Sequence, residues 1–184
     1  MFVISRTTPA YFLTSVCHNR LPVFQTDKIK QIVCAALDEA RRSSGIRIFA
    51  FVIMPDHHHL ITDASRSIAE TLRYMNGITA RRVIGYLMDN GYESSLAKLR
   101  IQLRERKHKH ALFEHHSNAF EIFGEDTMMQ KVNYVHLNPM RAGLVDDPMD
   151  YVYSSARQWS GRVGLDEPLV TNHREIKWRH SRRG

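Results

Sequence analysis

Cysteine is scarce in this sequence, because its 184 residues contain only Cys17 and Cys34. Two cysteines so far apart do not form a disulfide framework, so a reducing cytoplasm is the expected compartment. A structural zinc site is disfavoured for the same reason. Such a site normally needs four protein ligands at tight spacings, often cysteines, and no second Cys-His pair completes one here.

Long apolar runs are also absent. No stretch of eighteen apolar residues occurs, so we expect no transmembrane helix and no membrane partner. The first six residues lack the charged-then-apolar order of a signal peptide. The sequence has no Gly-x-x-x-x-Gly-Lys loop, which argues against ATP as a cofactor. A hydrophobic content of 43% is typical of one soluble domain with a full-sized core.

Acidic residues are outnumbered, since 19 Asp and Glu face 26 Lys and Arg, which gives a net charge of +7. This balance favours a polyanionic partner, most often nucleic acid. Basic side chains are densest between residues 96 and 110, where a solvated helix face or a loop is the alternative to a phosphate-binding role. The candidate DNA-binding residues are Lys98, Arg100, Arg104, Arg106, Lys107 and Lys109, together with Arg141.

The order of the predicted elements indicates a fold class. The pattern predicts strands over 11–17, 46–53 and 57–62, an interrupted strand within 112–123, and helices over 28–43, 68–89 and 125 to about 138. Asp27 is the expected N-cap of the first helix, and Pro139 is expected to end the last one. This order predicts an α+β fold, a ferredoxin-like antiparallel sheet with helices packed on it. We expect this domain at residues 1–160 and a basic C-terminal extension at 161–184.

Three consecutive histidines, 57 to 59, follow the apolar run and a turn at Pro55-Asp56. Side chains of a strand alternate between its faces, so His57 and His59 project together, roughly 7 Å apart, and His58 points the other way. Two imidazoles at that separation can hold one divalent cation. The alternative is a set of polar residues on a solvated strand face.

A second segment can complete such a site. Tyr134 and Asn138 lie four residues apart, so on a helix they share one face. If that face lies over the histidines, the Asn138 carbonyl oxygen can be a third ligand and Tyr134 Oη a nucleophile beside the cation. Imidazole and oxygen ligands with open positions suit Mg²⁺ or Mn²⁺. The alternative for Tyr134 is a tyrosine half-packed on the core.

These two motifs resemble a known family. Residues 54–61, Met-Pro-Asp-His-His-His-Leu-Ile, resemble the signature of the single-tyrosine HUH transposases. Residues 134–145, Tyr-Val-His-Leu-Asn-Pro-Met-Arg-Ala-Gly-Leu-Val, are similar to the helix that carries their catalytic tyrosine. The form is closest to the REP-associated branch, which is related to the IS200-like transposases. The resemblance implies that His57, His59 and Asn138 are metal ligands and that Tyr134 is the nucleophile.

The same resemblance implies metal-dependent cleavage and strand transfer of single-stranded DNA through a 5′-phosphotyrosine intermediate. The substrate would be hairpin or repeat DNA, and the protein would act as a homodimer or as a monomer. Two other classes stay open. A non-catalytic single-stranded nucleic-acid-binding module could use a ferredoxin-like sheet, although the usual stacking motif is missing from this sequence. A metal-dependent hydrolase that uses water would share the histidines but leave no covalent intermediate.

Overall fold

The protein folds around one four-stranded sheet, which a computed structural model describes for residues 1–101, 110–115 and 117–179. The strands are β1 (Ala10–Val16), β2 (Ile48–Ile53), β3 (His57–Asp63) and β4 (Asn118–Ile122). The helices are α1 (Asp27–Ser44), α2 (Ile68–Asp89), α3 (Glu93–Lys98), α4 (Glu125–Arg141) and α5 (Ala156–Trp159). Short 3-10 helices cover His18–Arg20, Pro148–Asp150 and His173–Glu175.

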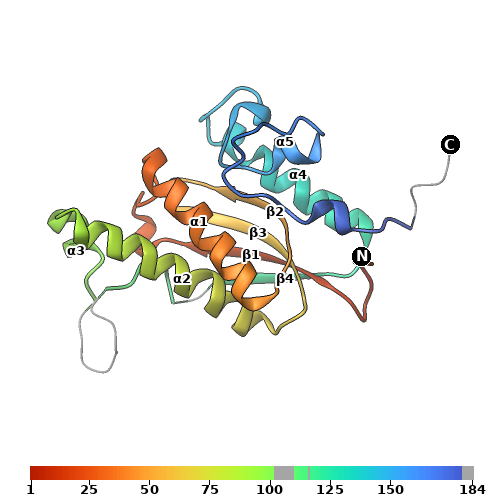
Figure 1. Ribbon diagram of the computed structural model, residues 1–184, viewed down its shortest axis with the longest axis horizontal. Coiled ribbons are helices and arrows are strands. Elements are labelled where there is room, and N and C mark those ends of the chain that lie inside the picture. Colours follow the sequence, from red (N-terminus) through yellow and green to blue (C-terminus); the bar gives the residue numbers. More distant parts are fainter. Residues whose placement is uncertain (102–109, 116, 180–184) are drawn as a thin grey trace.

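The strand order in the sheet is β2-β3-β1-β4, and every paired neighbour runs antiparallel (Figure 1). Apart from the short α3, the chain order up to α4 is strand, helix, two strands, helix, strand, helix. The predicted α+β fold with a ferredoxin-like antiparallel sheet is therefore confirmed. No helix within the described ranges combines the length and the apolar character that crossing a bilayer requires.

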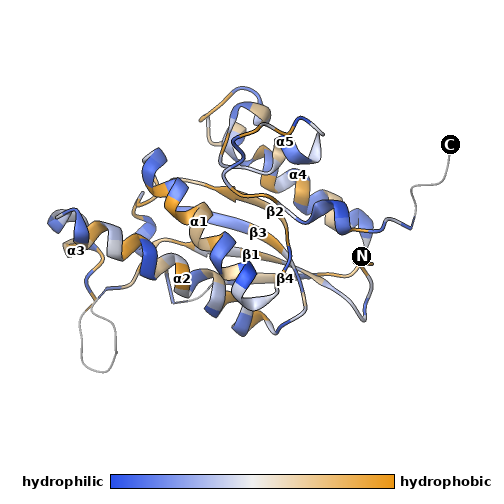
Figure 2. Ribbon diagram, viewed as in Figure 1, coloured by the Kyte–Doolittle hydropathy of each residue, from blue (hydrophilic) through white to orange (hydrophobic). Residues whose placement is uncertain are grey.

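The helices cover both faces of the sheet. Helices α1 and α2 pack side by side over one face (Figure 1). Helix α4 covers the other, where Tyr134 contacts Phe12 and His59. The strands are largely apolar, but part of β3 is hydrophilic (Figure 2). That hydrophilic part is the histidine run, and all of its backbone lies inside the sheet because β3 is paired on both sides.

The two edges of the sheet differ. All six residues of β2 are buried, since the C-terminal part of the chain covers this edge. The Ile53 N–H donates to the Tyr153 carbonyl, and the Asn172 N–H donates to the Ile48 carbonyl. The opposite edge strand, β4, is exposed along Asn118–Glu121. An exposed edge beside the face that α4 covers is accessible to a ligand.

The C-terminal segment packs on this core beyond residue 160. Ile176 pairs with Phe2 in a parallel bridge. The indole of Trp178 lies 6.1 Å from that of Trp159 between ring centroids. These contacts place 169–178, within the expected extension, against the domain.

One ion-pair cluster fastens this segment to the sheet. The carboxylate of Asp63 at the end of β3 is 1% exposed and accepts from Arg47 Nη1 at 2.9 Å. Arg47 Nε also donates to Glu175 Oε2 at 2.6 Å. Glu175 has a lowered pKa, first because Asn172 donates to it and then because Arg47 does.

We expect Arg47→Met to lower the free energy of unfolding by about 2 kcal/mol, because a buried carboxylate then loses its cation. Urea denaturation measures this loss. The matched control is Arg81→Met. Arg81 is paired with Glu39, and the Arg81 side chain is 66% exposed. The control should change stability by less than about 0.5 kcal/mol. Equal, small changes in both variants would contradict the assigned role of Arg47.

Two predicted helix ends need correction. The N-cap of α1 is Thr26 rather than Asp27, because the Thr26 side chain accepts from the Ile29 N–H. Pro139 does not end α4, which continues to Arg141. Proline removes one N–H donor close to the helix end, where few helical bonds remain to be lost. Its carbonyl still accepts from the Leu144 N–H at 2.9 Å.

The segment between α2 and β4 also differs from its prediction. A short helix that was not predicted, α3, occupies Glu93–Lys98 and overlaps only the start of the basic run at 96–110. Strand β4 is shorter than 112–123 and begins at Asn118. Before it, Phe113 forms an isolated bridge with Cys17, which extends the β1 edge discontinuously. The expected interruption of this strand is therefore present.

Candidate active site

The two histidines at alternate positions of β3 share one face of the sheet. The rings of His57 and His59 lie 4.8 Å apart between centroids. His59 pairs in register with Thr14 of β1 on one side and with Val52 of β2 on the other. The site thus sits in the middle of the sheet, on a rigid element.

Hydrogen bonds orient both imidazoles in the same sense. His57 Nδ1 lies 2.6 Å from Asp56 Oδ1, and His59 Nδ1 lies 2.9 Å from Thr14 Oγ1. With Nδ1–H as the donor in each bond, each Nε2 carries a lone pair. A carboxylate or hydroxyl behind a histidine is the usual way to fix a metal-ligating tautomer. His59 Nε2 is buried and has no hydrogen-bond partner within the described part of the chain.

The electrostatics favour a neutral His59. Burial first, and then the nearby His57, His58 and Lys131, together lower its pKa to about 3. A neutral imidazole with an unused Nε2 is the form that binds a metal ion. The residues present therefore fit a divalent cation at this place.

Tyr134 lies directly beside this pair. Its ring centroid is 5.3 Å from that of His59 and 5.8 Å from that of Phe12. Helix α4 holds it there by burying Val132 and Val135 in the core. The Tyr134 side chain itself stays 40% exposed. This position and this exposure fit the predicted nucleophile, and they also fit the alternative of a tyrosine half-packed on the core.

The predicted third ligand, Asn138, follows Tyr134 by one turn of α4 and is partly buried. Its side chain makes no hydrogen bond to any of the residues described. No cluster of three or more His, Cys, Asp or Glu side chains that could hold a metal occurs within the described ranges. A metal at His57 and His59 would therefore need another kind of third ligand, and an amide oxygen is one.

His58 points to the opposite face, as predicted. It is completely buried and contacts Phe113, with ring centroids 5.4 Å apart. Burial lowers the pKa of His58 to about 3, although the Asn76 side chain on α2 acts to raise it. Neither ring nitrogen of His58, nor Asn76 Oδ1, forms a hydrogen bond of normal geometry with described residues. His58 therefore belongs to the core and not to the site.

The family model described as "Transposase IS200 like" matches residues 6–89, a span that includes both site histidines. Over this span the chain is similar to the IS200-like transposase family. No match was found among the curated proteins.

Two solved structures share the fold of this chain. The REP-associated tyrosine transposase bound to a REP hairpin is 16% identical, with a TM-score of 0.62 over 94% of this chain and 90% of that one. A protein from Deinococcus radiodurans R1 that is assigned as a transposase is 18% identical, with a TM-score of 0.50 over 70% of this chain and 88% of that one. At these identities the likeness supports the fold, while the family match supports a transposase function.

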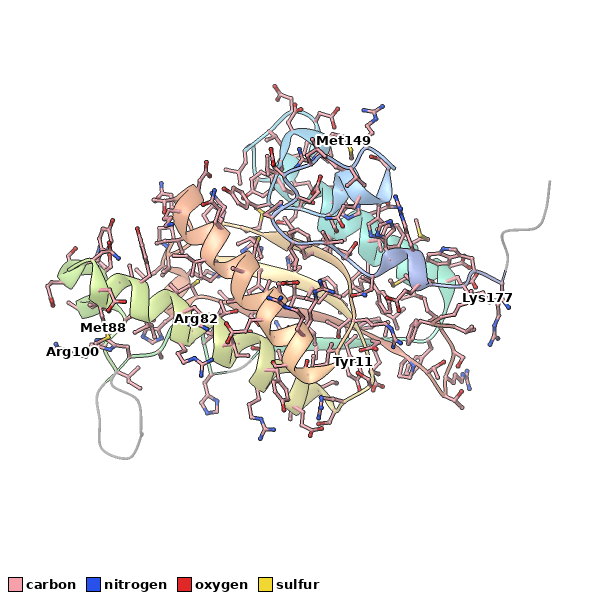
Figure 3. All side chains as sticks on the ribbon, viewed as in Figure 1. Tyr11, Arg82, Met88, Arg100, Met149 and Lys177 are labelled. Atoms are coloured by element: carbon pink, nitrogen blue, oxygen red, sulfur yellow. The ribbon has the colours of Figure 1, made fainter. Side chains whose placement is uncertain are left out.

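The predicted basic residues that the structure describes are not gathered in one place. Arg141, on α4, lies with its guanidinium carbon 5.7 Å from the Tyr134 ring centroid. Lys98 and Arg100 are exposed, and Arg100 lies near Met88 at the far end of α2, away from Lys177 (Figure 3). Arg104, Arg106, Lys107 and Lys109 lie outside the described residues. Of the predicted basic residues within the described ranges, Arg141 is thus the one that lies beside the tyrosine.

Sequence reasoning missed several residues of this site. Thr14 and Phe12 reach it only through the pairing register of β1 with β3. Lys131 reaches it from α4, with its Nζ 4.8 Å from the Phe12 ring centroid. Its spacing of three residues from Tyr134 was the available signal, because residues three apart share a helix face.

Proposed function

We propose that this protein cleaves and rejoins single-stranded DNA through a covalent 5′-phosphotyrosine on Tyr134. The observation that carries the proposal is the contact of the Tyr134 ring with His59, whose buried Nε2 has no partner within the described residues. A nucleophile beside an imidazole that can bind a metal ion suits metal-assisted phosphoryl transfer. The family match supplies the substrate class.

The reaction transfers one phosphodiester to the protein. Tyr134 Oη attacks the scissile phosphorus and loses its proton, the new O–P bond forms, and the P–O3′ bond breaks. The leaving O3′ takes up a proton and becomes a free 3′-hydroxyl. Attack by such a hydroxyl on the phosphotyrosine restores a phosphodiester and the free phenol. The bond energy is conserved in the adduct, so no nucleotide cofactor is needed.

Activation of the phenol is the main energetic cost. With a reference pKa near 10, forming the phenolate at pH 7 costs about 4 kcal/mol. Arg141 places a positive charge over the Tyr134 ring, close to where the scissile phosphate would lie. A bound Mg²⁺ or Mn²⁺, held by His57, His59 and Asn138, would polarise the scissile phosphate.

A DNA hairpin is the proposed substrate form. The REP-associated relative was solved with a REP hairpin, and the net charge of +7 favours a polyanion. We assign the catalytic unit to residues 1–160, with the expected extension packed on it, and a DNA substrate is consistent with a cytoplasmic protein.

A labelled suicide oligonucleotide, in which the leaving fragment is lost after cleavage, tests the function. With Mg²⁺ or Mn²⁺ we expect a protein-DNA band that survives SDS and heating. A hydrolase using water would cut the strand without that band. A non-catalytic binding module would do neither, so a single gel separates the three classes.

A further inference from the structure

Next to the proposed site, two phenylalanines face each other across neighbouring strands. Phe12 of β1 pairs in register with Phe120 of β4. Phe12 lies two positions from Thr14, so the pair occupies the face of the sheet that carries His57 and His59. Phe12 also contacts His59, with ring centroids 5.2 Å apart. The two rings thus extend the histidine face toward the exposed edge of the sheet.

A lysine lies against both rings. Lys131 Nζ is 4.8 Å from the Phe12 ring centroid and 4.7 Å from that of Phe120. It forms no ion pair or hydrogen bond with any residue that the structure describes. Its three N–H donors and its charge are therefore available beside the site. The Lys131 charge is close enough to His59 to contribute to the lowering of its pKa.

Phe120 is the exposed end of this group. Its side chain is 48% exposed, although Phe12 beside it is only 9% exposed. Asn118 to Glu121 on the same edge strand are exposed as well. Aromatic rings exposed beside a free cation are the usual combination with which proteins bind single-stranded nucleic acid, the ring under a base and the cation on a phosphate. The positive net charge favours an anionic occupant.

We propose that Phe120 and Lys131 form a nucleotide subsite next to the scissile phosphate, in which the Phe120 ring stacks on a DNA base and the Lys131 ammonium contacts a phosphate. The proposal rests on the proposed function, because it takes the strand that Tyr134 attacks as its occupant. It assigns the exposed β4 edge to the path of the DNA strand. Both residues bind and position the substrate and take no part in bond making.

The stacking part is tested by fluorescence anisotropy in EDTA, with a labelled dT20 and a labelled 20-residue abasic strand as probes. A stacked base is worth about 1–3 kcal/mol, so Phe120→Ala should weaken dT20 binding roughly fivefold or more. Its affinity for the abasic strand should stay within about twofold. Phe120→Tyr should restore dT20 binding, and Phe120→Leu, which keeps the apolar contact, should not.

The phosphate part is tested by the salt dependence of dT20 binding. Losing one phosphate contact reduces the slope of log K against log salt by about 0.7 for a single strand. Lys131→Gln should show that reduction and Lys131→Arg should not. The matched control is Lys28→Gln, which removes an exposed lysine from α1 on the opposite face and should leave the slope unchanged.

Two results would overturn the subsite. The first is that Phe120→Ala and Phe120→Leu weaken binding of dT20 and of the abasic strand equally, or weaken neither. The second is that Lys131→Gln leaves the salt slope unchanged, as Lys28→Gln does. These binding measurements need no cleavage, so they stand apart from the covalent assay. A wild-type protein that forms the SDS-stable adduct but fails here loses only the subsite. If the Phe120 and Lys131 variants behave as predicted but the wild-type protein forms no adduct, the proposed function is wrong and the subsite stands.

Discussion

Replacing Tyr134 with phenylalanine is expected to abolish the covalent protein-DNA adduct, a loss of at least about a thousandfold, because the attacking oxygen is removed. Binding of the same oligonucleotide should change by less than about threefold. The Tyr134 side chain is 40% exposed, and its hydroxyl forms no hydrogen bond with a described residue. Stability should therefore stay within about 0.5 kcal/mol. SDS gels measure the adduct and anisotropy measures the binding.

The control for this variant is Tyr92→Phe. Tyr92 is 46% exposed and lies just before α3, beside Tyr86 in the last turn of α2. It should form the adduct at the wild-type rate. A Tyr134→Phe protein that still forms the SDS-stable band would show that another residue is the nucleophile.

Replacing His59 with alanine is expected to reduce metal-dependent cleavage at least a hundredfold and to remove binding of Mn²⁺. The reason is that His59 presents its buried, unused Nε2 next to the tyrosine. His57→Ala should act in the same direction. Electron paramagnetic resonance of free Mn²⁺ reports binding directly, and cleavage of the suicide oligonucleotide reports activity.

His58 provides the matched control for the histidine pair. It sits between the other two in sequence but on the opposite face, fully buried, and its ring nitrogens have no hydrogen-bond partner among described residues. His58→Leu should therefore keep Mn²⁺ binding and cleavage, and it should not destabilise the fold, since it removes two unsatisfied buried nitrogens. Equal losses in His58→Leu and His59→Ala would argue against the division of the strand into two faces.

Much of the fold follows from local patterns. Strand β2 is predictable because every residue is apolar, and the alternation of β3 assigns its histidines to two faces. Helix α2 matches its predicted bounds, because Ser67 and Glu70 form a capping box. Helix ends were less predictable. Whether a proline near the C-terminus of a helix ends that helix depends on whether the following loop supplies N–H donors for the last carbonyls.

The site was predictable only in part. The His57 and His59 pair and Tyr134 come from short motifs, and the structure brings all three rings together. The role of Asn138 as third ligand stays a prediction. The group formed by Phe12, Phe120 and Lys131 depends on strand register and on the packing of α4, which no local pattern specifies.

Mass spectrometry of the trapped protein-DNA adduct tests the central claim most directly. After nuclease and protease digestion, we expect the peptide that contains Tyr134 to carry a 5′-linked nucleotide on that residue. A nucleotide found on another residue, or cleavage without any modified peptide, would contradict the account.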